Sequence, residues 1–276
     1  MTPAGDLSRE PLTPEALGPF LETAVFGRGL IETHRVIDST NRRARELAGE
    51  NAAEGALVLA ETQTAGRGRF GRSWHSPPGK NLYFSLILRP ALPLEKTPLL
   101  TLAAGLGAGE ALGRTVGRRP DIKWPNDLLL DGLKIAGLLA ESEGREKGAG
   151  FVVLGLGLNV NLGADELPVE LAGRAGSLLM ATGRTWDRAE VLAALLKGLE
   201  DEYLALEAGG EADMLARYRK RCLTLGRTVR VAQGREVIEG KALDVDPKGR
   251  LVVQIGPGGE TTAVSAGEAT ITGAGY

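Results

Sequence analysis

The predicted elements of this chain change in kind near Leu225. Before this point, apolar strands alternate with helices, and two amphipathic helices are predicted over residues 187–207 and 211–222. After it, only short alternating strands remain, with turns such as Gly256-Pro257-Gly258-Gly259 between them. This order predicts an α+β fold, in which a mixed sheet with flanking helices is followed by a small C-terminal SH3-like β-barrel.

The chain has 276 residues, which is long enough for these two domains. We expect an N-terminal extension over residues 1–30, a main domain over 31–224 and the β-barrel domain over 225–276. The predicted strands of the main domain cover residues 34–37, 55–60, 81–88, 121–124, 127–130, 134–142 and 151–162. Its first helices are predicted over 38–50 and 95–116, and the glycines of the second helix predict close packing against the sheet. Thr13 and Pro14 are expected to start a short helix in the N-terminal extension.

Composition excludes several classes of protein. The net charge is −2 and the pI is about 5.9, so the overall charge favours neither nucleic acid nor a membrane surface. Cys222, on a predicted helix, is the single cysteine, which favours a reducing compartment. The N-terminus lacks the apolar core of a signal peptide, and no run approaches the ~20 apolar residues of a membrane span. We therefore expect a cytoplasmic protein.

Glycine and arginine dominate the segment GRGRFGRSW, residues 66–74, which directly follows the predicted strand 55–60. Arginine grips carboxylate or phosphate oxygens in pairs, and glycine lets a ligand approach main-chain N–H groups. One interpretation is therefore a loop that closes on a small anion. The others are a solvated basic loop, and a nucleic-acid contact in which Phe70 and Trp74 stack on bases. The segment alone does not separate these interpretations.

The segment Lys123-Trp124-Pro125-Asn126-Asp127 presents a cation, an amide and a carboxylate at one rigid corner. Pro125 fixes its own φ and pushes Trp124 toward an extended conformation. The three polar groups suit a phosphate and its magnesium ion. A strand end turned by Asn-Asp has the same pattern.

Lys134 opens a strongly apolar predicted strand. Simple alternation places its side chain on the face of Ala136 and Leu138, where it can point into a half-buried cleft. A partly desolvated ammonium there would be a strong anion clamp. The alternative is a solvated strand end.

Two further patterns have both structural and functional interpretations. Gly155 and Gly157 lie on one face of the predicted strand 151–162, which they are expected to interrupt, and bare glycine leaves room for a flat ligand. A kinked or bulged strand explains them equally well. Ser39-Thr40-Asn41 is a helix N-cap cluster, and its hydroxyls and amide also suit a ureido or amide group of a ligand.

Together these segments resemble the biotin–protein ligases, also called biotin–[acetyl-CoA-carboxylase] ligases. The matching pieces, in the family's order, are Ser39-Thr40-Asn41, Gln63 with Gly66-Arg67-Gly68-Arg69 and Trp74, Lys123-Trp124-Pro125-Asn126-Asp127, Lys134-Ile135-Ala136-Gly137, and Gly155-Leu156-Gly157-Leu158-Asn159. The resemblance covers about residues 30–272 and implies a class II synthetase-like catalytic domain. It is to the short monofunctional type, because too few residues precede His34 for the DNA-binding domain that some members carry.

The resemblance implies that biotin is activated with ATP to biotinyl-5′-AMP and then transferred to a lysine of a biotin carboxyl carrier domain. Biotin and ATP would be the substrates, with Mg²⁺ bound and its ligands unassigned. The implied catalytic residues are Lys134 and Arg67. The implied biotin-binding residues are Ser39, Thr40, Asn41, Gln63, Gly66, Arg67, Gly68, Arg69, Lys134, Gly155 and Gly157. The implied ATP-binding residues are Arg69, Arg72, Trp74, Lys123, Asn126, Asp127, Lys134 and Asn159. The loop 66–74 would order over the adenylate and exclude water.

Two alternatives stay open at this point. A lipoate–protein ligase has a related fold and the same adenylate chemistry, but the Gly-Arg-Gly-Arg loop with Lys-Trp-Pro-Asn-Asp favours biotin. A nucleic-acid-binding module could use the loop 66–74, but the acidic net charge and the lack of a second basic cluster argue against it. We expect no binding to DNA or to a membrane. The sequence leaves a homodimer open and does not identify the carrier.

Overall fold

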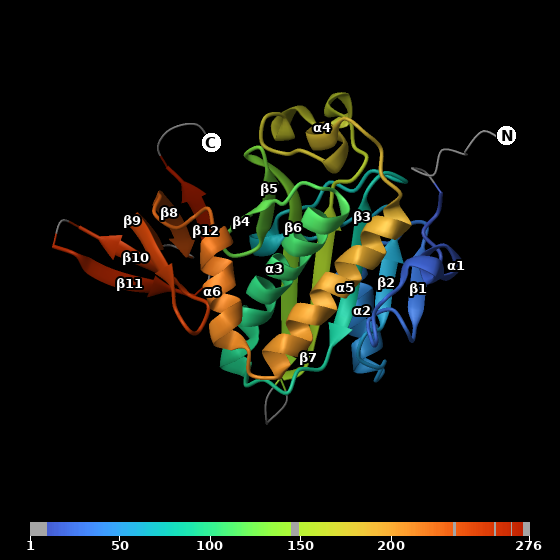
Figure 1. Ribbon diagram of the computed structural model, residues 1–276, viewed down its shortest axis with the longest axis horizontal. Helices are drawn as coiled ribbons and strands as arrows, with labels where there is room; N and C mark the ends of the chain where they lie inside the picture. The colour runs from blue at the N-terminus through green and yellow to red at the C-terminus, as the bar shows by residue number, and fades with distance from the viewer. Residues whose placement is uncertain (1–9, 145–148, 234–235, 257, 266, 273–276) are drawn as a thin grey trace.

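A mixed β-sheet forms the centre of the larger part of the protein (Figure 1). The computed structural model describes residues 10–144, 149–233, 236–256, 258–265 and 267–272. Within these ranges the sheet has seven strands in the order β1-β2-β3-β7-β6-β5-β4. Only the β1–β2 pair is parallel. The strands are β1 (Ile31–His34), β2 (Leu57–Ala60), β3 (Leu82–Leu88), β4 (Asp121–Lys123), β5 (Asp127–Leu130), β6 (Leu133–Gly144) and β7 (Ala149–Leu158).

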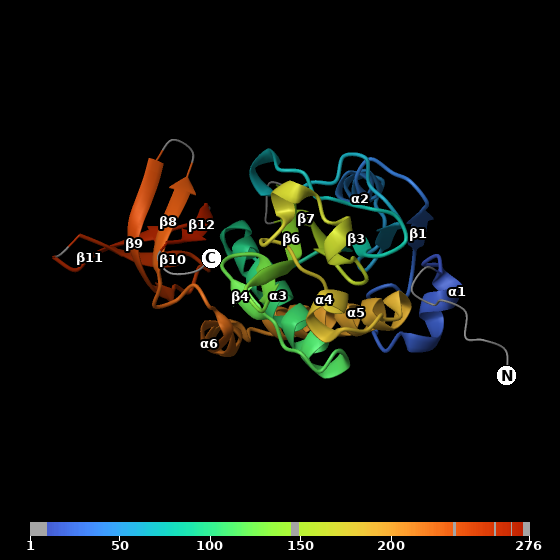
Figure 2. The same cartoon turned by 90° about the horizontal axis from the view of Figure 1, so that it is seen from above.

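Helices cover both faces of this sheet (Figure 2). The long helices α3 (Thr97–Thr115) and α5 (Arg188–Glu207) lie on one face, and α2 (Thr40–Gly49) lies on the other. Side chains alternate accordingly along the central strands: Leu57 and Leu59 pack into the core on the α3 and α5 side, while Val58 packs into the core beneath α2. Burial on both faces explains why these strands are continuous apolar runs in the sequence.

The closest approach of α3 and α5 is between two glycines. A Cβ on Gly107 would lie 2.2 Å from the Gly198 carbonyl oxygen, and a Cβ on Gly198 would lie 2.4 Å from the Gly107 carbonyl oxygen. Real Cβ atoms never come so near, so the two backbones can touch here only because both residues are glycine. The expected packing of this glycine-rich helix on the sheet is confirmed, since a Cβ on Gly105 would lie 3.8 Å from Ile122 Cγ2 of β4, but the sheet is not its tightest neighbour. The tight contact is with α5.

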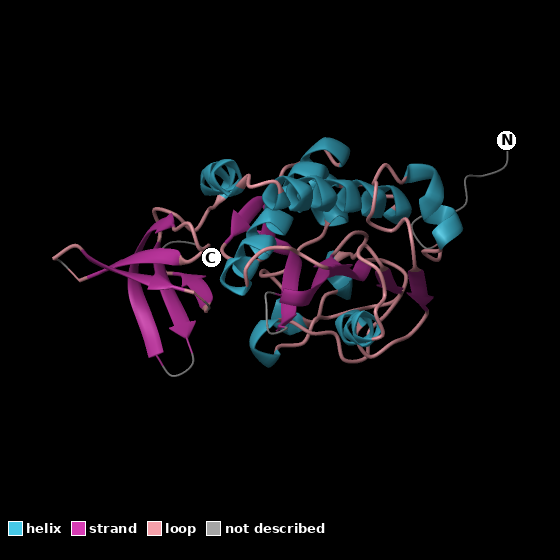
Figure 3. Ribbon diagram, turned by 90° about the horizontal axis from the view of Figure 1, so that it is seen from below, coloured by secondary structure: helices cyan, strands magenta, loops and turns pink. Residues whose placement is uncertain are grey.

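A second, antiparallel sheet follows the last helix, α6 (Glu211–Arg221), and contains no helix of its own in the described residues (Figure 3). Its strand order is β11-β10-β9-β8-β12. The strands are β8 (Thr228–Gln233), β9 (Glu236–Val245), β10 (Leu251–Ile255), β11 (Glu260–Val264) and β12 (Glu268–Ile271). Alternate residues such as Val229, Val231 and Val253 are fully buried, which gives the sheet one apolar face. The predicted fold class, helices on a mixed sheet followed by short antiparallel strands, is confirmed.

Several local predictions differ from the structure. The first strand was predicted over 34–37, but β1 ends at His34 and Val36 is 57% exposed. The glycines of β7 were expected to interrupt it, but β7 pairs with β3 and β6 in unbroken register through both of them. The short helix α4 (Leu178–Thr182) was not predicted. No helix in the described part of the chain has both the length and the apolar character needed to cross a membrane.

The segment that precedes β1 packs on α5. The predicted helix start is confirmed, because α1 (Pro14–Leu17) begins with proline and the Thr13 hydroxyl accepts the Ala16 N–H. Further along, the buried Glu200 carboxylate of α5 accepts three main-chain N–H groups from residues 24–26 at 2.7–2.9 Å.

Candidate active site

A cleft of about 1040 Å³ opens on the α2 face of the large sheet and extends to the C-terminal sheet. It begins at the N-terminal end of α2, where Asn41 in the first turn covers Gly155, and it continues past Gly157 of β7. All of the residues predicted for the site line it except Gly66. Segments scattered over the whole chain are thus brought to one place. Which of them bind a ligand is a separate question.

Hydroxyl and amide groups form the end of the cleft beside α2. Gln63 Oε1 accepts hydrogen bonds from the Thr40 N–H at 2.9 Å and from Thr40 Oγ1 at 3.2 Å. Gln63 Nε2 donates to Ser76 Oγ at 3.3 Å. Ser39 occupies the N-cap position of α2, but its side chain makes no capping hydrogen bond. The N-cap interpretation of this cluster therefore does not account for the Ser39 hydroxyl.

The Asn41 side chain explains Gly155. A Cβ on Gly155 would lie 1.9 Å from Asn41 Oδ1, so any larger residue would collide with the amide. Asn41 is held in place, because its Nδ2 donates to Glu141 Oε2 at 3.0 Å and to the Leu139 carbonyl at 3.4 Å. The bare backbone at Gly155 is therefore filled by the protein itself rather than left open for a flat ligand.

The Trp74 indole covers Gly157 in the same way. A Cβ on Gly157 would lie 2.5 Å from Trp74 Cε2 and 2.6 Å from Trp74 Nε1. This Nε1 is buried and has no hydrogen-bond partner among the described residues. Buried N–H groups are normally satisfied, so an unpartnered donor at the floor of a cleft is consistent with a ligand acceptor. A ring system can pack against Gly157 only if the indole shifts.

Lys134 points into the cleft, although not for the reason given by simple alternation. The consecutive residues Leu128 and Leu129 of β5 pair with Ala136 and Lys134 of β6, so β6 has a β-bulge with Ile135 as the extra residue. The extra residue shifts the alternation, so the face of Lys134 is that of Gly137 and not that of Ala136. Lys134 Nζ would lie 3.3 Å from a Cβ on Gly137, whereas Ala136 is in the core beneath α3 and α5.

The Lys134 ammonium lies between two groups of the cleft. Its Nζ is 2.6 Å from Asp127 Oδ1 and 5.3 Å from the centroid of the Trp74 ring. The side chain is 35% exposed and the Asp127 side chain is 19% exposed. The cation is therefore partly desolvated, stabilised by one carboxylate and by the face of one aromatic ring.

The segment 66–74 forms a small hydrogen-bonded loop. The Trp74 N–H donates to the Gly66 carbonyl at 2.9 Å, and the Gly68 N–H donates to the Arg72 carbonyl at 2.7 Å. Gly71 turns the chain with a φ of +74°, and Phe70 before it has a φ of +56°. Gly66 does not line the cleft; a Cβ there would lie 2.8 Å from the Trp74 carbonyl oxygen, so this glycine lets the loop close.

The arginines of this loop contact polar groups on opposite sides of the cleft. Arg67 pairs with Glu141 of β6 at 3.1 Å. Arg69 Nη1 donates to Asn126 Oδ1 at 3.2 Å and to the Gly267 carbonyl at 3.3 Å, which connects the loop to the C-terminal sheet. Arg72 also lines the cleft. The loop folds over a pocket and pairs with its walls, which does not favour an open basic surface for nucleic acid.

The segment 123–127 is anchored through its tryptophan. Trp124 is 2% exposed. Its main-chain N–H donates to Thr224 Oγ1 at 2.9 Å, and its indole Nε1 donates to the Gly249 carbonyl at 3.1 Å. The Trp124–Pro125 peptide bond is cis. Trp124 thus fixes the corner to the C-terminal sheet. Its polar neighbours Lys123, Asn126 and Asp127 line the cleft.

Sequence reasoning missed one wall of the cleft, residues 162–175. The Lys134 N–H donates to the Arg174 carbonyl at 3.0 Å, and the Gly176 N–H donates to the Lys134 carbonyl at 2.9 Å. These bonds join the segment to the start of β6. Its residues have neither helical nor strand periodicity, so no sequence signal indicated its position. Glu141, the partner of Arg67 and Asn41, was also missed.

The described residues offer no metal site made of the protein alone. They contain no group of three or more His, Cys, Asp or Glu side chains that could hold an ion. Asp127 is the acidic side chain of the predicted nucleotide end, and it is paired with Lys134. A magnesium ion in this cleft would therefore take most of its oxygen ligands from phosphates and water, as Mg²⁺ often does.

Comparison with known proteins supports these observations. The model of the Biotin/lipoate A/B protein ligase family matches residues 33–159, and that of the Biotin protein ligase C terminal domain matches residues 224–270. The biotin protein ligase from Aquifex aeolicus, solved in complex with biotin and ATP, superimposes with a TM-score of 0.75 at 31% identity. The match covers 88% of this chain and 99% of that one. The fold is that of the biotin/lipoate class of protein ligases.

Individual relatives show to which family within this class of protein ligases the chain belongs. The biotin--[acetyl-CoA-carboxylase] ligase of Mycobacterium tuberculosis is 36% identical over 95% of this chain and 97% of its own length. The bifunctional ligase/repressor BirA of Bacillus spizizenii is 41% identical over 85% of this chain and 72% of its own length. This chain belongs to the biotin protein ligase family.

Proposed function

We propose that this protein is a biotin–protein ligase that joins biotin to a lysine of a biotin carboxyl carrier domain in two steps. In the first, a biotin carboxylate oxygen attacks the α-phosphorus of ATP, and the bond to pyrophosphate breaks. In the second, the lysine amine attacks the acyl carbon of biotinyl-5′-AMP, and AMP leaves. The names of the relatives favour biotin over lipoate as the acid.

The position of Lys134 is the observation that carries this proposal. Its Nζ lies between Trp74, beside the hydroxyl and amide end of the cleft, and Asp127, beside the phosphate-binding candidates. An acid bound at the first end and a nucleotide bound at the second would meet at this ammonium. Two anions must approach each other there, and a fixed positive charge in a partly water-excluded site lowers the energy of that approach.

The other residues divide along the length of the cleft. We assign biotin to Ser39, Thr40, Asn41 and Gln63, whose groups suit its ureido ring, while Gly155 and Gly157 leave room for the Asn41 and Trp74 side chains beside it. We assign the junction to Arg67, Gly68, Arg69 and Lys134, with Gly66 shaping the loop. We assign ATP to Arg69, Arg72, Trp74, Lys123, Asn126, Asp127, Lys134 and Asn159. No protein nucleophile is needed, because phosphoryl transfer depends on positioning and charge neutralisation.

Magnesium fits as part of the nucleotide complex. When bound, it would neutralise phosphate charge, and the side-chain oxygens of Asp127 and Asn126 could serve as its protein ligands. Asp127 already stabilises Lys134, so its carboxylate would hold that ammonium toward the phosphate side. The loop 66–74 would close over the intermediate and keep water from hydrolysing it.

Incubation with labelled biotin, ATP, magnesium and a carrier domain tests the proposal. Label should appear on the carrier, and lipoate should not substitute for biotin. Labelling by lipoate alone would establish the lipoate alternative. Oligonucleotide binding that falls steeply with salt, without carrier labelling, would refute the ligase in favour of a nucleic-acid module.

Arg67→Gln and Lys134→Met should each lower the rate of biotin-dependent pyrophosphate release by about 10²–10³-fold, as loss of an oxyanion-type donor does. Lys96→Met is the matched control. Lys96 also forms a 2.6 Å ion pair, with Glu211, but it lies outside the cleft. Its rate should match that of the wild type. A normal rate in the variant that lacks both Arg67 and Lys134 would contradict the assigned chemistry.

We further propose a division into residues 1–30, a catalytic domain over 31–224 and a C-terminal domain over 225–276. The acidic net charge and the lone, buried Cys222 support a cytoplasmic enzyme without affinity for DNA. A homodimer is compatible with this function.

A further inference from the structure

Arg188 is a buried cation at the start of α5. Its side chain is 1% exposed, whereas arginine is rarely fully buried. It is the first residue of α5, where the helix dipole disfavours positive charge. A buried ion pair is often no more stabilising than apolar side chains of similar volume. Its contacts therefore call for another explanation.

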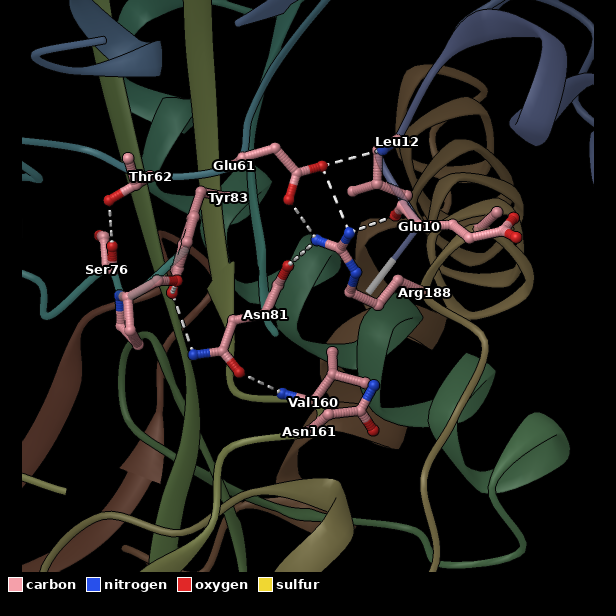
Figure 4. A network of polar contacts seen from close by, with 12 residues as sticks. Glu10, Leu12, Glu61, Thr62, Ser76, Asn81, Tyr83, Val160, Asn161 and Arg188 are labelled. Carbon is pink, nitrogen blue, oxygen red and sulfur yellow. Dashed lines mark hydrogen bonds and ion pairs between the residues drawn. The ribbon is translucent and has the colours of Figure 1, made fainter. Parts of the chain in front are cut away.

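The guanidinium joins three segments that are far apart in the sequence (Figure 4). Arg188 Nη1 donates to Glu61 Oε2 at 2.8 Å and to the Asn81 carbonyl at 3.2 Å. Arg188 Nη2 donates to Glu61 Oε1 at 3.3 Å and to the Glu10 carbonyl. Glu61 Oε1 also accepts the Leu12 N–H at 2.9 Å. The N-terminal segment, the residues after β2 and the start of β3 thus meet at one side chain.

From Glu61 the chain runs directly into the hydroxyl and amide end of the cleft. Thr62 Oγ1 donates to the Ser76 carbonyl at 2.5 Å. Gln63 then accepts both hydrogen bonds from Thr40, at the start of α2. Glu61 is two residues from Gln63, so the ion pair with Arg188 anchors the main chain close to the Gln63 amide.

A second set of hydrogen bonds leads from Asn81 to Asn159, which lies in another wall of the cleft. The Asn81 side chain is fully buried, and its Oδ1 accepts the Val160 N–H at 2.9 Å. Its Nδ2 lies 3.0 Å from Tyr83 Oη and 3.5 Å from Asn159 Oδ1. Asn159 lines the cleft. One guanidinium therefore contacts segments that lead to two walls of the cleft, the Gln63 wall at the hydroxyl and amide end and the Asn159 wall, while neither Arg188 nor Glu61 lines it.

We propose that Arg188 and Glu61 form a positioning pair that holds the biotin-binding end of the cleft in shape, acting chiefly through Gln63. This inference rests on the proposed function. The pair touches neither substrate; it fixes the donors and acceptors that do. Its loss should therefore weaken biotin binding and leave nucleotide binding nearly unchanged.

Arg188→Lys tests the pair with charge retained. An ammonium cannot reproduce the two-pronged contact with Glu61 while also reaching Asn81 and Glu10. We expect the Kd for biotin, measured by calorimetry, to rise about tenfold, or about 1.4 kcal/mol. The KM for ATP should stay within about twofold in the pyrophosphate assay. Glu61→Gln is a milder second variant that should shift the Kd in the same direction if Arg188→Lys fails to fold.

Arg217→Lys is the matched control. Arg217 contacts Glu202 with the same two-pronged geometry, at 2.6 and 2.9 Å, and it joins α6 to α5 away from the cleft. This variant should lose stability and keep the wild-type Kd for biotin. Equal Kd changes in Arg188→Lys and Arg217→Lys would show a general structural effect and overturn the inference.

A double-mutant cycle tests the route through Gln63. In a Gln63→Ala background, Arg188→Lys should change the Kd for biotin by less than about twofold, since coupled residues are non-additive. The same tenfold effect in both backgrounds would overturn the inference. A wild-type protein that binds no biotin would instead refute the proposed function, and this inference with it. Wild-type binding with an unchanged Kd in both the Arg188→Lys and Glu61→Gln variants would refute this inference alone.

Discussion

The two glycines of β7 should respond differently to the same added methyl group. Gly155 and Gly157 are two residues apart on one face of one strand, but each is covered by a different side chain. Asn41 covers the first and is held by hydrogen bonds to β6. Trp74 covers the second and stands at the end of a loop. We predict that Gly155→Ala reduces stability and that Gly157→Ala reduces biotin binding.

The distances give the sizes of the two effects. A Cβ at 1.9 Å from Asn41 Oδ1 cannot be accommodated, and moving Asn41 breaks its hydrogen bonds. Overpacking and lost hydrogen bonds cost about 3 kcal/mol together, and replacing a strand glycine returns about 0.5–1 kcal/mol. The Gly155→Ala variant should therefore be about 2 kcal/mol less stable than the wild type.

At Gly157 the added carbon would lie 2.5 Å from the indole, whereas carbon atoms pack at about 3.5–4.0 Å. The indole must move by about 1 Å, and the loop allows it, so the unfolding free energy should change by less than about 1 kcal/mol. A misplacement of about 1 Å can lower a reaction rate about 10²-fold, and the same misfit lowers the affinity for a ligand that contacts the indole. We expect the Kd for biotin to rise by about 10–100-fold.

Urea unfolding and biotin titration measure the two quantities separately. Tryptophan fluorescence adds a direct reporter, because Trp124 and Trp186 are only 2% and 5% exposed and lie outside the moving loop. A biotin-dependent change in emission should disappear in Trp74→Phe. Equal stability and equal biotin affinity in the two glycine variants would refute the assignment of Asn41 and Trp74 as the reasons for these glycines.

Three other predictions concern stability and reactivity. Gly107→Ala should lower the free energy of unfolding, measured with urea, by at least about 1–2 kcal/mol, because the collision with α5 outweighs the helix-propensity gain of about 1 kcal/mol. Gly109→Ala in the same helix is the control: a Cβ there would lie 3.9 Å from its nearest neighbour, so this variant should be stabilised. Burial raises the pKa of the Cys222 thiol, so Ellman's reagent at pH 8 should label only unfolded protein, and rapid native labelling would contradict the buried position. Hydrogen bonds from Arg43 lower the pKa of the Glu32 carboxyl below its ordinary value of 4.5. The stability that this pair contributes is therefore fully present above pH 4.5 and is lost as the pH falls through the lowered pKa. The stability difference between wild type and Glu32→Gln should accordingly shrink in acid, and a difference independent of pH would exclude this pair as its source.

Much of the cleft could be located from the sequence, because its segments sit next to strongly patterned strands. The loop 66–74 follows a buried strand, and Lys123 to Asp127 joins two strands of a predicted hairpin series, so each segment falls at the sheet once the strands form. The turn at Asp131-Gly132, with φ of +51° and +77°, was likewise visible as a hairpin signal. Local chemistry and local geometry agree at these positions.

The features that the sequence predicted wrongly, or did not predict, each have a specific physical cause. The face of Lys134 was predicted from a period of two, and a bulge in the β5–β6 pairing shifts that period by one residue. The reason for Gly155 depends on Asn41, more than a hundred residues earlier in the chain, which no local pattern reveals. Arg188 and Glu61 are 127 residues apart and each is unremarkable in its own segment. Pairings across such distances appear only when the chain is folded.

The hydrogen bond from Arg69 to the Gly267 carbonyl spans 198 positions of the chain, and residues 269–271 close the same end of the cleft. During synthesis at about 5–20 residues per second, the ribosome needs roughly 10–40 s to travel from one partner to the other. A nascent or proteolysed chain that stops before β12 has the cationic loop but lacks this wall. Such fragments would leave a reactive anhydride open to water. The order of synthesis therefore delays formation of the anhydride until the cleft that shields it is complete.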